Sequence, residues 1–88
     1  MNINTDDLKK KIIYRSLYRG TKEMDFLLGS FVKKYIDSFN ENELDDLLNM
    51  LDVDDVTLYN YNQNKKESGK IVINNVSLLF REYIYKNH

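Results

Sequence analysis

The chain contains no cysteine, no proline and no tryptophan, and only three of its 88 residues are glycine. Without cysteine it can form no disulfide, offers no thiolate nucleophile and cannot build a cysteine-based metal site. This composition fits a reducing compartment. The chain also lacks any apolar run of the about 18–20 residues that cross a bilayer, so we expect no membrane insertion.

The amino terminus lacks the features of the common targeting sequences. Residues 1–7 carry no positively charged side chain and no apolar core, so they do not resemble a secretory signal. Asp6 and Asp7 also argue against a mitochondrial transit peptide, because such peptides are rich in arginine and poor in acidic residues. We therefore expect a cytoplasmic protein of a bacterium, and a processed organellar form is the alternative.

An excess of charge of either sign is absent too. The formal net charge is −1, although 31% of the residues are charged. A general nucleic-acid binder needs a basic face to neutralise phosphates, so we expect no nucleic acid as a partner. With 42% hydrophobic residues, the composition is that of a globular protein. We expect one domain over residues 1–88, with its core at about 5–85 and a free energy of unfolding of about 4–13 kcal/mol.

The apolar residues recur at intervals of three and four, which predicts an all-α protein, a compact five-helix bundle without strands. The expected helices cover about 5–18, about 22–39, 40 to the acidic turn at 52–55, that turn to about 61, and about 70–85. Residues 71–73 are β-branched, but the helical period continues beyond them, so we expect them in the last helix. The period is clearest in the second helix, where it comprises Met24, Leu27, Leu28, Phe31, Val32 and Tyr35.

Short polar residues mark where these helices begin. Asn4 or Thr5 can cap the first helix, and Asn40 with Glu43 forms an Asn-x-x-Glu capping box for the third. The acidic turn at 52–55 can supply the cap of the fourth helix. The apolar residues that we expect in the core from the other helices are Leu8, Ile12, Tyr14, Leu17, Leu44, Leu47, Leu48, Leu51, Leu58, Val72, Val76, Leu79, Phe80 and Tyr83.

The corner between the first two helices carries the most informative residues. Gly20 interrupts the helical pattern and fits the left-handed conformation that ends many helices. Arg19 precedes it and Glu23 follows one helical turn later. The spacing fits an ordinary loop, with Arg19 solvated and Glu23 near the helix dipole. It also fits a recognition corner, with the arginine fork binding carboxylates or carbonyls of a partner. Gly29, inside the second helix, predicts close approach of another helix or of a partner.

A likeness to a known family favours the recognition corner. It rests on the run Arg19-Gly20-x-x-Glu23-x-Asp25-x-x-Leu28-Gly29-x-Phe31. This run resembles the signature of an all-helical family, the bacterial SdhE proteins and the mitochondrial succinate dehydrogenase assembly factors, whose hallmark is Arg-Gly-x-x-Glu. Residues 51–61 resemble the family's acidic turn, leucine and two aromatics, and the likeness covers about 8–85. The sequence departs from the family at Val56, where proline is usual, and at Tyr61, where tryptophan is frequent.

The resemblance implies an SdhE-like helical fold and a helper function. Proteins of this family bind the flavoprotein subunit of succinate dehydrogenase, and the related fumarate reductase subunit is a second candidate partner. They promote covalent attachment of FAD to a histidine of that partner. We therefore expect an assembly factor or chaperone, a monomer, that is not an enzyme. FAD belongs to the partner, and this chain has no phosphate-binding fingerprint to hold it.

The resemblance also assigns partner binding to Arg19, Gly20 and Glu23. The second tier of partner-binding candidates comprises Tyr18, Asp25, Asp54, Asp55 and Tyr61. The two aspartates at the acidic turn fit a helix cap and first turn better than a metal site, because a divalent cation needs more oxygen ligands than this segment offers. His88, the only histidine, is the last residue and a poor general base.

Two other classes of protein remain as alternatives. One is a small helical adaptor or transcriptional regulator that binds another protein or DNA through a helix–turn–helix. Its would-be recognition helices carry Asp25, Asp54 and Asp55 where a basic edge would be needed. The other is an enzyme, for which the sequence offers no Ser-His-Asp set, glycine-rich phosphate loop or zinc site.

Overall fold

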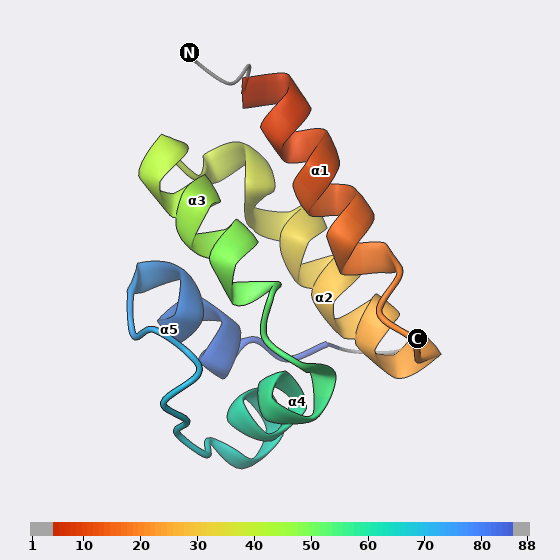
Figure 1. Ribbon diagram of the computed structural model, residues 1–88, viewed down its shortest axis with the longest axis vertical. Helices are drawn as coiled ribbons and strands as arrows, with labels where there is room; N and C mark the ends of the chain where they lie inside the picture. Colours follow the sequence, from red (N-terminus) through yellow and green to blue (C-terminus); the bar gives the residue numbers. More distant parts are fainter. Residues whose placement is uncertain (1–4, 86–88) are drawn as a thin grey trace.

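The computed structural model describes residues 5–85, which form five α-helices and one short 3₁₀ helix (Figure 1). The elements are α1 (Thr5–Leu17), α2 (Lys22–Tyr35), η1 (Ile36–Ser38), α3 (Glu41–Met50), α4 (Asp55–Asn64) and α5 (Asn75–Glu82). No strand occurs between residues 5 and 85, so the all-α prediction is confirmed. Asn4, one of the predicted caps, and His88 lie outside the described residues.

The helices pack in two groups that share α3. Helix α1 packs against α2 and α3, while α5 packs against α3 and α4 (Figure 1). The Cα radius of gyration is 12.3 Å, close to the about 12 Å of a compact globule of this length. Helix α1 lies on the outside of this arrangement, and its end leads directly into the corner with α2.

The core is built largely from the apolar faces that the sequence predicts. The α2 residues Met24, Leu27, Leu28, Phe31 and Val32 are buried, and Phe31 meets Phe80 edge-on with ring centroids 5.3 Å apart. In α1 the prediction is only partly right. Leu8 and Ile12 are buried, but Tyr14 and Leu17 are exposed, and Ser16 is buried in their place.

Two of the predicted helix boundaries are confirmed by their caps. Asn40 and Glu43 form the reciprocal capping box of α3, with bonds of 2.9 and 3.0 Å. Asp54 caps α4 by accepting a hydrogen bond from the backbone N–H of Thr57 at 3.1 Å. Helix α2 ends at Tyr35, and the predicted stretch to residue 39 continues as the tighter helix η1.

The start of α5 differs from the prediction. The sequence predicts a helix from about residue 70, but residues 70–74 are not helical and Val72 is exposed. The physical reason is a second capping box. Asn74 accepts from the N–H of Ser77, and the Ser77 hydroxyl accepts from the N–H of Asn74, each at 2.9 Å. The β-branched residues before this cap favour an extended backbone. Helix α5 also ends at Glu82 rather than at 85.

The end of α5 is tied to the rest of the bundle by polar side chains. The buried side chain of Asn62 donates to the carbonyls of Phe80 and Tyr83 at 2.6 and 2.8 Å. The Tyr83 hydroxyl donates to Ser30 Oγ in α2 at 2.8 Å. These bonds satisfy backbone groups that a helix end leaves unpaired and fix α5 against α4 and α2.

Candidate functional site

The corner between α1 and α2 is a tight turn set by three residues. Gly20 has φ +109°, so the predicted need for a positive φ at this position is confirmed. Thr21 caps α2 by accepting a hydrogen bond from the N–H of Met24 at 3.2 Å. The backbone N–H of Arg19 donates to Asp25 Oδ1 at 2.6 Å. Asp25 is therefore half-buried and holds the turn closed.

The side chain of Arg19 turns inward and spans the gap to the α3–α4 connection. Its Nε donates to Asp55 Oδ1 at 2.8 Å, its Nη1 to the Leu51 carbonyl at 2.5 Å and its Nη2 to the Val53 carbonyl at 2.7 Å. Only 12% of the side chain is exposed. The guanidinium is therefore neither solvated, as in an ordinary loop, nor a free fork, because each of its three nitrogens already has a partner within the chain.

Of the predicted site residues at the corner, Tyr18, Gly20 and Glu23 are exposed, as are the intervening Thr21 and Lys22. The Glu23 side chain makes no hydrogen bond or ion pair with any residue between 5 and 85. A Cβ added to Gly20 would meet nothing within 4 Å, so the chain leaves the space beside this residue open. Among the three residues of the motif, the glycine and the glutamate therefore face outward and the arginine faces inward.

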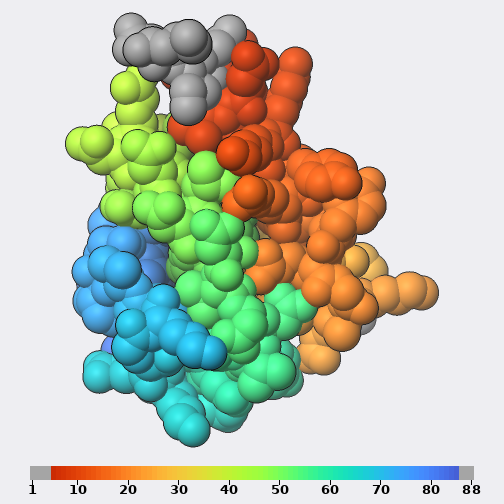
Figure 2. Space-filling model, in the orientation of Figure 1, coloured from red at the N-terminus to blue at the C-terminus, as the bar shows by residue number. Residues whose placement is uncertain are grey.

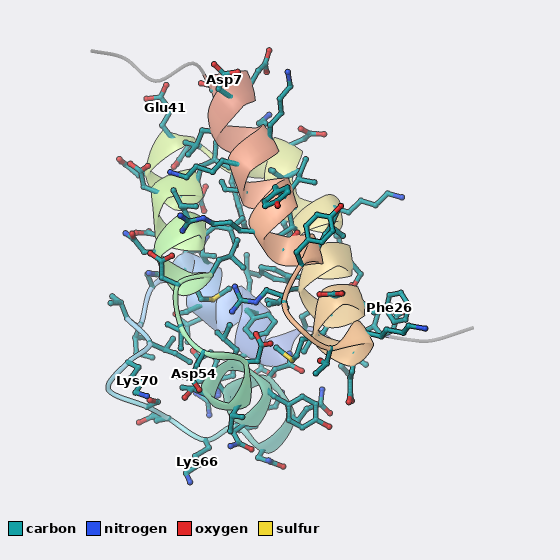
Figure 3. All side chains as sticks on the ribbon, turned by 45° about the vertical axis from the view of Figure 1, so that its right-hand side comes forward. Asp7, Phe26, Glu41, Asp54, Lys66 and Lys70 are labelled. Atoms are coloured by element: carbon teal, nitrogen blue, oxygen red, sulfur yellow. The ribbon has the colours of Figure 1, made fainter. Side chains whose placement is uncertain are left out.

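The second-tier candidates separate into three positions. Asp55 is bound to Arg19, as described above. Asp54 caps α4 and lies beside Lys70, 3.3 Å from its Nζ (Figure 3). Hydrogen bonds from the hydroxyl and the backbone N–H of Thr57, assisted by Lys70, hold the pKa of Asp54 below its ordinary value of 3.8. Tyr61 is completely buried, so its ring offers no surface to a partner and it is withdrawn from the candidate site.

A shallow groove of about 400 Å³ runs between the end of α1 and the α3–α4 connection. Figure 2 shows this face, with side chains from the end of α1 in orange beside those of the connection in green. The rings of Tyr14 and Tyr18 form one wall, with centroids 4.7 Å apart. Arg15 reaches across the groove to Asp52, with Nη1 and Oδ1 2.5 Å apart. The helical period predicts Tyr14 in the core, but Tyr14 is exposed, and its i, i+4 spacing to Tyr18 puts both rings on one helix face.

A second groove lies on the other side of α1, between α1 and α2. It measures about 380 Å³, and its apolar lining includes Ile13, Leu17, Gly29, Val32 and Ile36. A Cβ built on Gly29 would lie 3.0 Å from Leu17 Cδ2, so the predicted close approach at this glycine is confirmed and is made by α1. Each side of the exposed face of α1 is therefore bordered by a groove.

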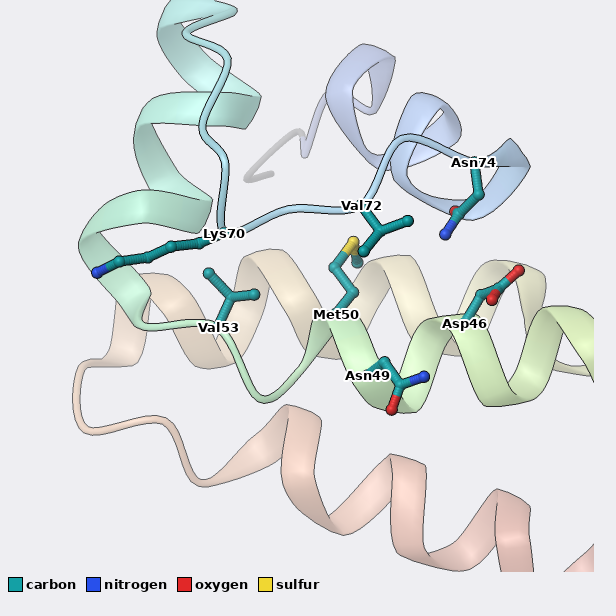
Figure 4. A pocket seen from close by; sticks show the side chains of 7 residues that line it. All are labelled: Asp46, Asn49, Met50, Val53, Lys70, Val72 and Asn74. Atoms are coloured by element: carbon teal, nitrogen blue, oxygen red, sulfur yellow. The ribbon is translucent and has the colours of Figure 1, made fainter.

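The remaining hollows offer no chemistry of their own. One of about 110 Å³ lies between α3 and residues 70–74, and Met50 and Val72 are among its lining residues (Figure 4). Over residues 5–85, no three side chains of His, Cys, Asp or Glu gather as they would around a metal ion. Within the same range, no helix is long and apolar enough to cross a bilayer.

Comparison with known proteins identifies the family. Residues 10–83 match the family described as the flavinator of succinate dehydrogenase. The chain belongs to this family. The matched range includes the corner, the α3–α4 connection, the groove beside that connection and all but Lys9 of the lining of the groove between α1 and α2. No solved structure matches the chain at a significant level.

Several curated proteins are similar to this member of the flavinator family. The FAD assembly factor SdhE of Wigglesworthia glossinidia brevipalpis is 35% identical over 68 residues, which cover 72% of this chain and 81% of that protein. The mitochondrial succinate dehydrogenase assembly factor 2 of Scheffersomyces stipitis is 43% identical over 56 residues, 62% of this chain and 38% of the relative. That of Saccharomyces cerevisiae is 46% identical over 52 residues. The chain thus matches well under half the length of the mitochondrial relatives.

Proposed function

We propose that this protein binds the flavoprotein subunit of succinate dehydrogenase and promotes the covalent attachment of FAD to that subunit. The observation that carries the proposal is the family match over residues 10–83. It is supported by the relative named FAD assembly factor, which the chain matches over most of both lengths. The fumarate reductase flavoprotein is the second candidate partner. The proposal includes a cytoplasmic location in a bacterium, in keeping with the bacterial relative, and action as a monomer.

The chain acts as a helper and not as an enzyme in this proposal. The bond-forming chemistry belongs to the flavin and to the histidine of the partner, and FAD is held by the partner. A bound helper accelerates such a step only by favouring the partner conformation in which the reacting groups are aligned. Once the bond has formed and the site has closed, affinity falls and the helper leaves.

The corner is the proposed partner-binding site, with different roles for its three motif residues. Gly20 and Glu23 are exposed and meet the partner directly, with Tyr18 beside them. Gly20 allows close approach because nothing lies within 4 Å of its missing Cβ. Arg19 contributes from within, because its bonds to Asp55 and two carbonyls hold the turn in shape.

Co-expression tests the function directly. The chain is produced with the succinate dehydrogenase flavoprotein subunit of the same organism, in a host that lacks its own factor. Covalent flavin is then read as fluorescence of the denatured subunit in a gel. We expect fluorescence only when the chain is present. Equal fluorescence without the chain would mean that the family match reports the fold alone, and a helical adaptor would become the better interpretation.

A charge-removing pair of variants tests the site. Glu23→Gln removes the free carboxylate of the corner, and Asp45→Asn makes the same change at an exposed position of α3. We expect both variants to melt like the wild type and only Glu23→Gln to reduce covalent flavin. Normal flavin with Glu23→Gln would remove Glu23 from the site without affecting the proposed function.

A further inference from the structure

The outer face of α1 changes from charged to apolar halfway along the helix. Its first half carries Lys9, Lys10 and Lys11, whereas its second half exposes large apolar side chains. Ile13 is 41% exposed, Tyr14 66%, Leu17 44% and Tyr18, just past the helix end, 70%. Single exposed apolar residues are common, but a contiguous set is typical of an interaction surface.

The geometry around this set fits a protein partner. We call Ile13, Tyr14, Leu17 and Tyr18 the α1 ridge. It stands between the two grooves of about 380 and 400 Å³, so a partner that covers the ridge can also place side chains in a hollow on either side. Within residues 5–85, every side chain of the ridge keeps at least 41% of its surface exposed. The ridge ends at Arg19 and Gly20 and is therefore continuous with the corner.

The charges beside the ridge indicate the chemistry of the partner. Lys10 lies one helical turn before Ile13 and Tyr14, and Lys33 lines the groove between α1 and α2. Both lysines are exposed and have no ion-pair partner between residues 5 and 85. Lys9 is already paired with Asp37 at 3.1 Å. Asp6 and Asp7 precede Lys10 by one helical turn, so the positive charge of this edge is local to Lys10 and Lys33, whose ammonium groups complement carboxylates.

We propose that the α1 ridge is a docking surface, continuous with the corner, for an apolar segment of the flavoprotein partner that carries acidic residues at the end facing Lys10. The inference rests on the proposed function and extends the contact along α1, away from the Arg-Gly-x-x-Glu motif. Tyrosines at the centre of such a surface supply large contact area at low entropic cost and are frequent hot spots.

Equilibrium binding of the full-length chain to the purified flavoprotein subunit tests the ridge. Tyr14→Ser removes an exposed ring from the ridge, and Val72→Ser removes an exposed apolar side chain from the segment before α5. We expect Tyr14→Ser to weaken binding about tenfold or more and Val72→Ser to leave it within about twofold. Circular dichroism melting should be unchanged in both, because both side chains are exposed.

A second pair of variants tests the charge. Lys10→Glu reverses a charge beside the ridge, and Lys66→Glu reverses an exposed charge after α4, at the opposite end of the molecule (Figure 3). We expect Lys10→Glu to weaken binding about fivefold to tenfold, less so at high salt, and Lys66→Glu to have little effect. Equal or tighter binding by Lys10→Glu would overturn the acidic partner segment.

The outcomes separate this inference from the proposed function. If Tyr14→Ser binds the subunit as tightly as the wild type does, the α1 ridge is not a docking surface and the proposed function stands. Failure of the wild type to bind the subunit overturns both. Two further results would assign the ridge to another occupant: a dimer by light scattering that Tyr14→Ser dissociates, or sedimentation with phosphatidylglycerol vesicles that Tyr14→Ser abolishes. Either result, without an effect of Tyr14→Ser on binding to the subunit, overturns the proposed docking.

Discussion

Arg19 Nε lies 2.8 Å from Asp55 Oδ1, although the two residues are 36 positions apart in the chain. With the bonds from the same guanidinium to the Leu51 and Val53 carbonyls, this ion pair joins the end of α1 to the start of α4. The corner and the acidic turn, the two segments that carry the family resemblance, therefore form one structural unit.

Loss of this clamp should destabilise the fold. Arg19→Ala leaves the Asp55 carboxylate and two carbonyls without their donor in a mostly buried position, which costs about 2–3 kcal/mol of the free energy of unfolding. In a domain of this size, that lowers the melting temperature by about 10–20 °C. Thermal melting followed by circular dichroism measures the effect.

Arg15→Ala is the matched control for the clamp. Arg15 pairs with Asp52 in the neighbouring groove, but the two side chains are 40% and 62% exposed. We expect its loss to cost less than about 1 kcal/mol, because solvent screens the pair. Equal melting temperatures for the two variants would contradict a structural role for Arg19.

Adding a methyl group should lower the free energy of unfolding at Gly20 but not at Gly29. Gly20→Ala meets no atom but must keep φ +109°, so we expect a loss of about 1–2 kcal/mol. Gly29→Ala brings a Cβ to 3.0 Å from Leu17 Cδ2, which is the end of a flexible, exposed side chain that can move. Since alanine is favoured over glycine within a helix, we expect Gly29→Ala to be neutral or stabilising by up to about 1 kcal/mol. Urea unfolding compares them, and a large loss at Gly29 would mean that Leu17 is fixed.

Neighbouring leucines of α3 should differ in the cost of truncation. Leu47 is completely buried, whereas Leu48, which the helical period also predicts in the core, is only half-buried. Leu47→Ala should open a cavity and cost about 2–5 kcal/mol. Leu48→Ala should cost about 1 kcal/mol, because it removes less area from a site that water can reach. Chemical unfolding of both variants measures the difference. Similar losses of unfolding free energy would contradict the complete burial of Leu47 and the half-burial of Leu48.

The cap of α4 should give stability a defined dependence on pH. Hydrogen bonds from Thr57 lower the pKa of Asp54 in the folded state. The resulting stability is complete above the unfolded-state pKa of about 3.9 and is lost as the pH falls through the lower folded-state value. Asn in place of Asp54 keeps a capping oxygen but does not titrate.

We therefore expect the free energy of unfolding of the wild type to exceed that of Asp54→Asn by a constant amount above about pH 5. Below about pH 4 this difference should shrink. Urea unfolding of both proteins across this range measures it. An advantage that grows on acidification would show that the Asp54 pKa is raised.

Local signals in the sequence predict the helices well where a cap and a period agree. Asn40 with Glu43 marks the start of α3, and the apolar period of α2 identifies its buried face. The start of α5 is missed because the period continues backward through residues 71–73. Its cap, Asn74 with Ser77, lacks the glutamate or glutamine of the usual box.

The candidate site is harder to predict because its geometry depends on residues far apart in the chain. The Arg-Gly-x-x-Glu pattern locates the corner, but nothing near Arg19 in the sequence indicates that its partners are Leu51, Val53 and Asp55. Tyr61 illustrates the same limit, since a helical period cannot tell a buried aromatic from one at a partner surface. The exposed ring of Tyr14 is missed for the same reason.

Helix α5 follows all the other described helices in the chain, yet it supplies three completely buried residues, Val76, Ser77 and Phe80. Phe80 packs against Phe31 of α2, and Asn62 of α4 donates to its carbonyl. During synthesis, the first four helices therefore leave the ribosome with their common core still open. The protein must complete its fold after translation of α5 and not progressively from the amino terminus, so a chain that stops before Val76 should be a substrate for proteases.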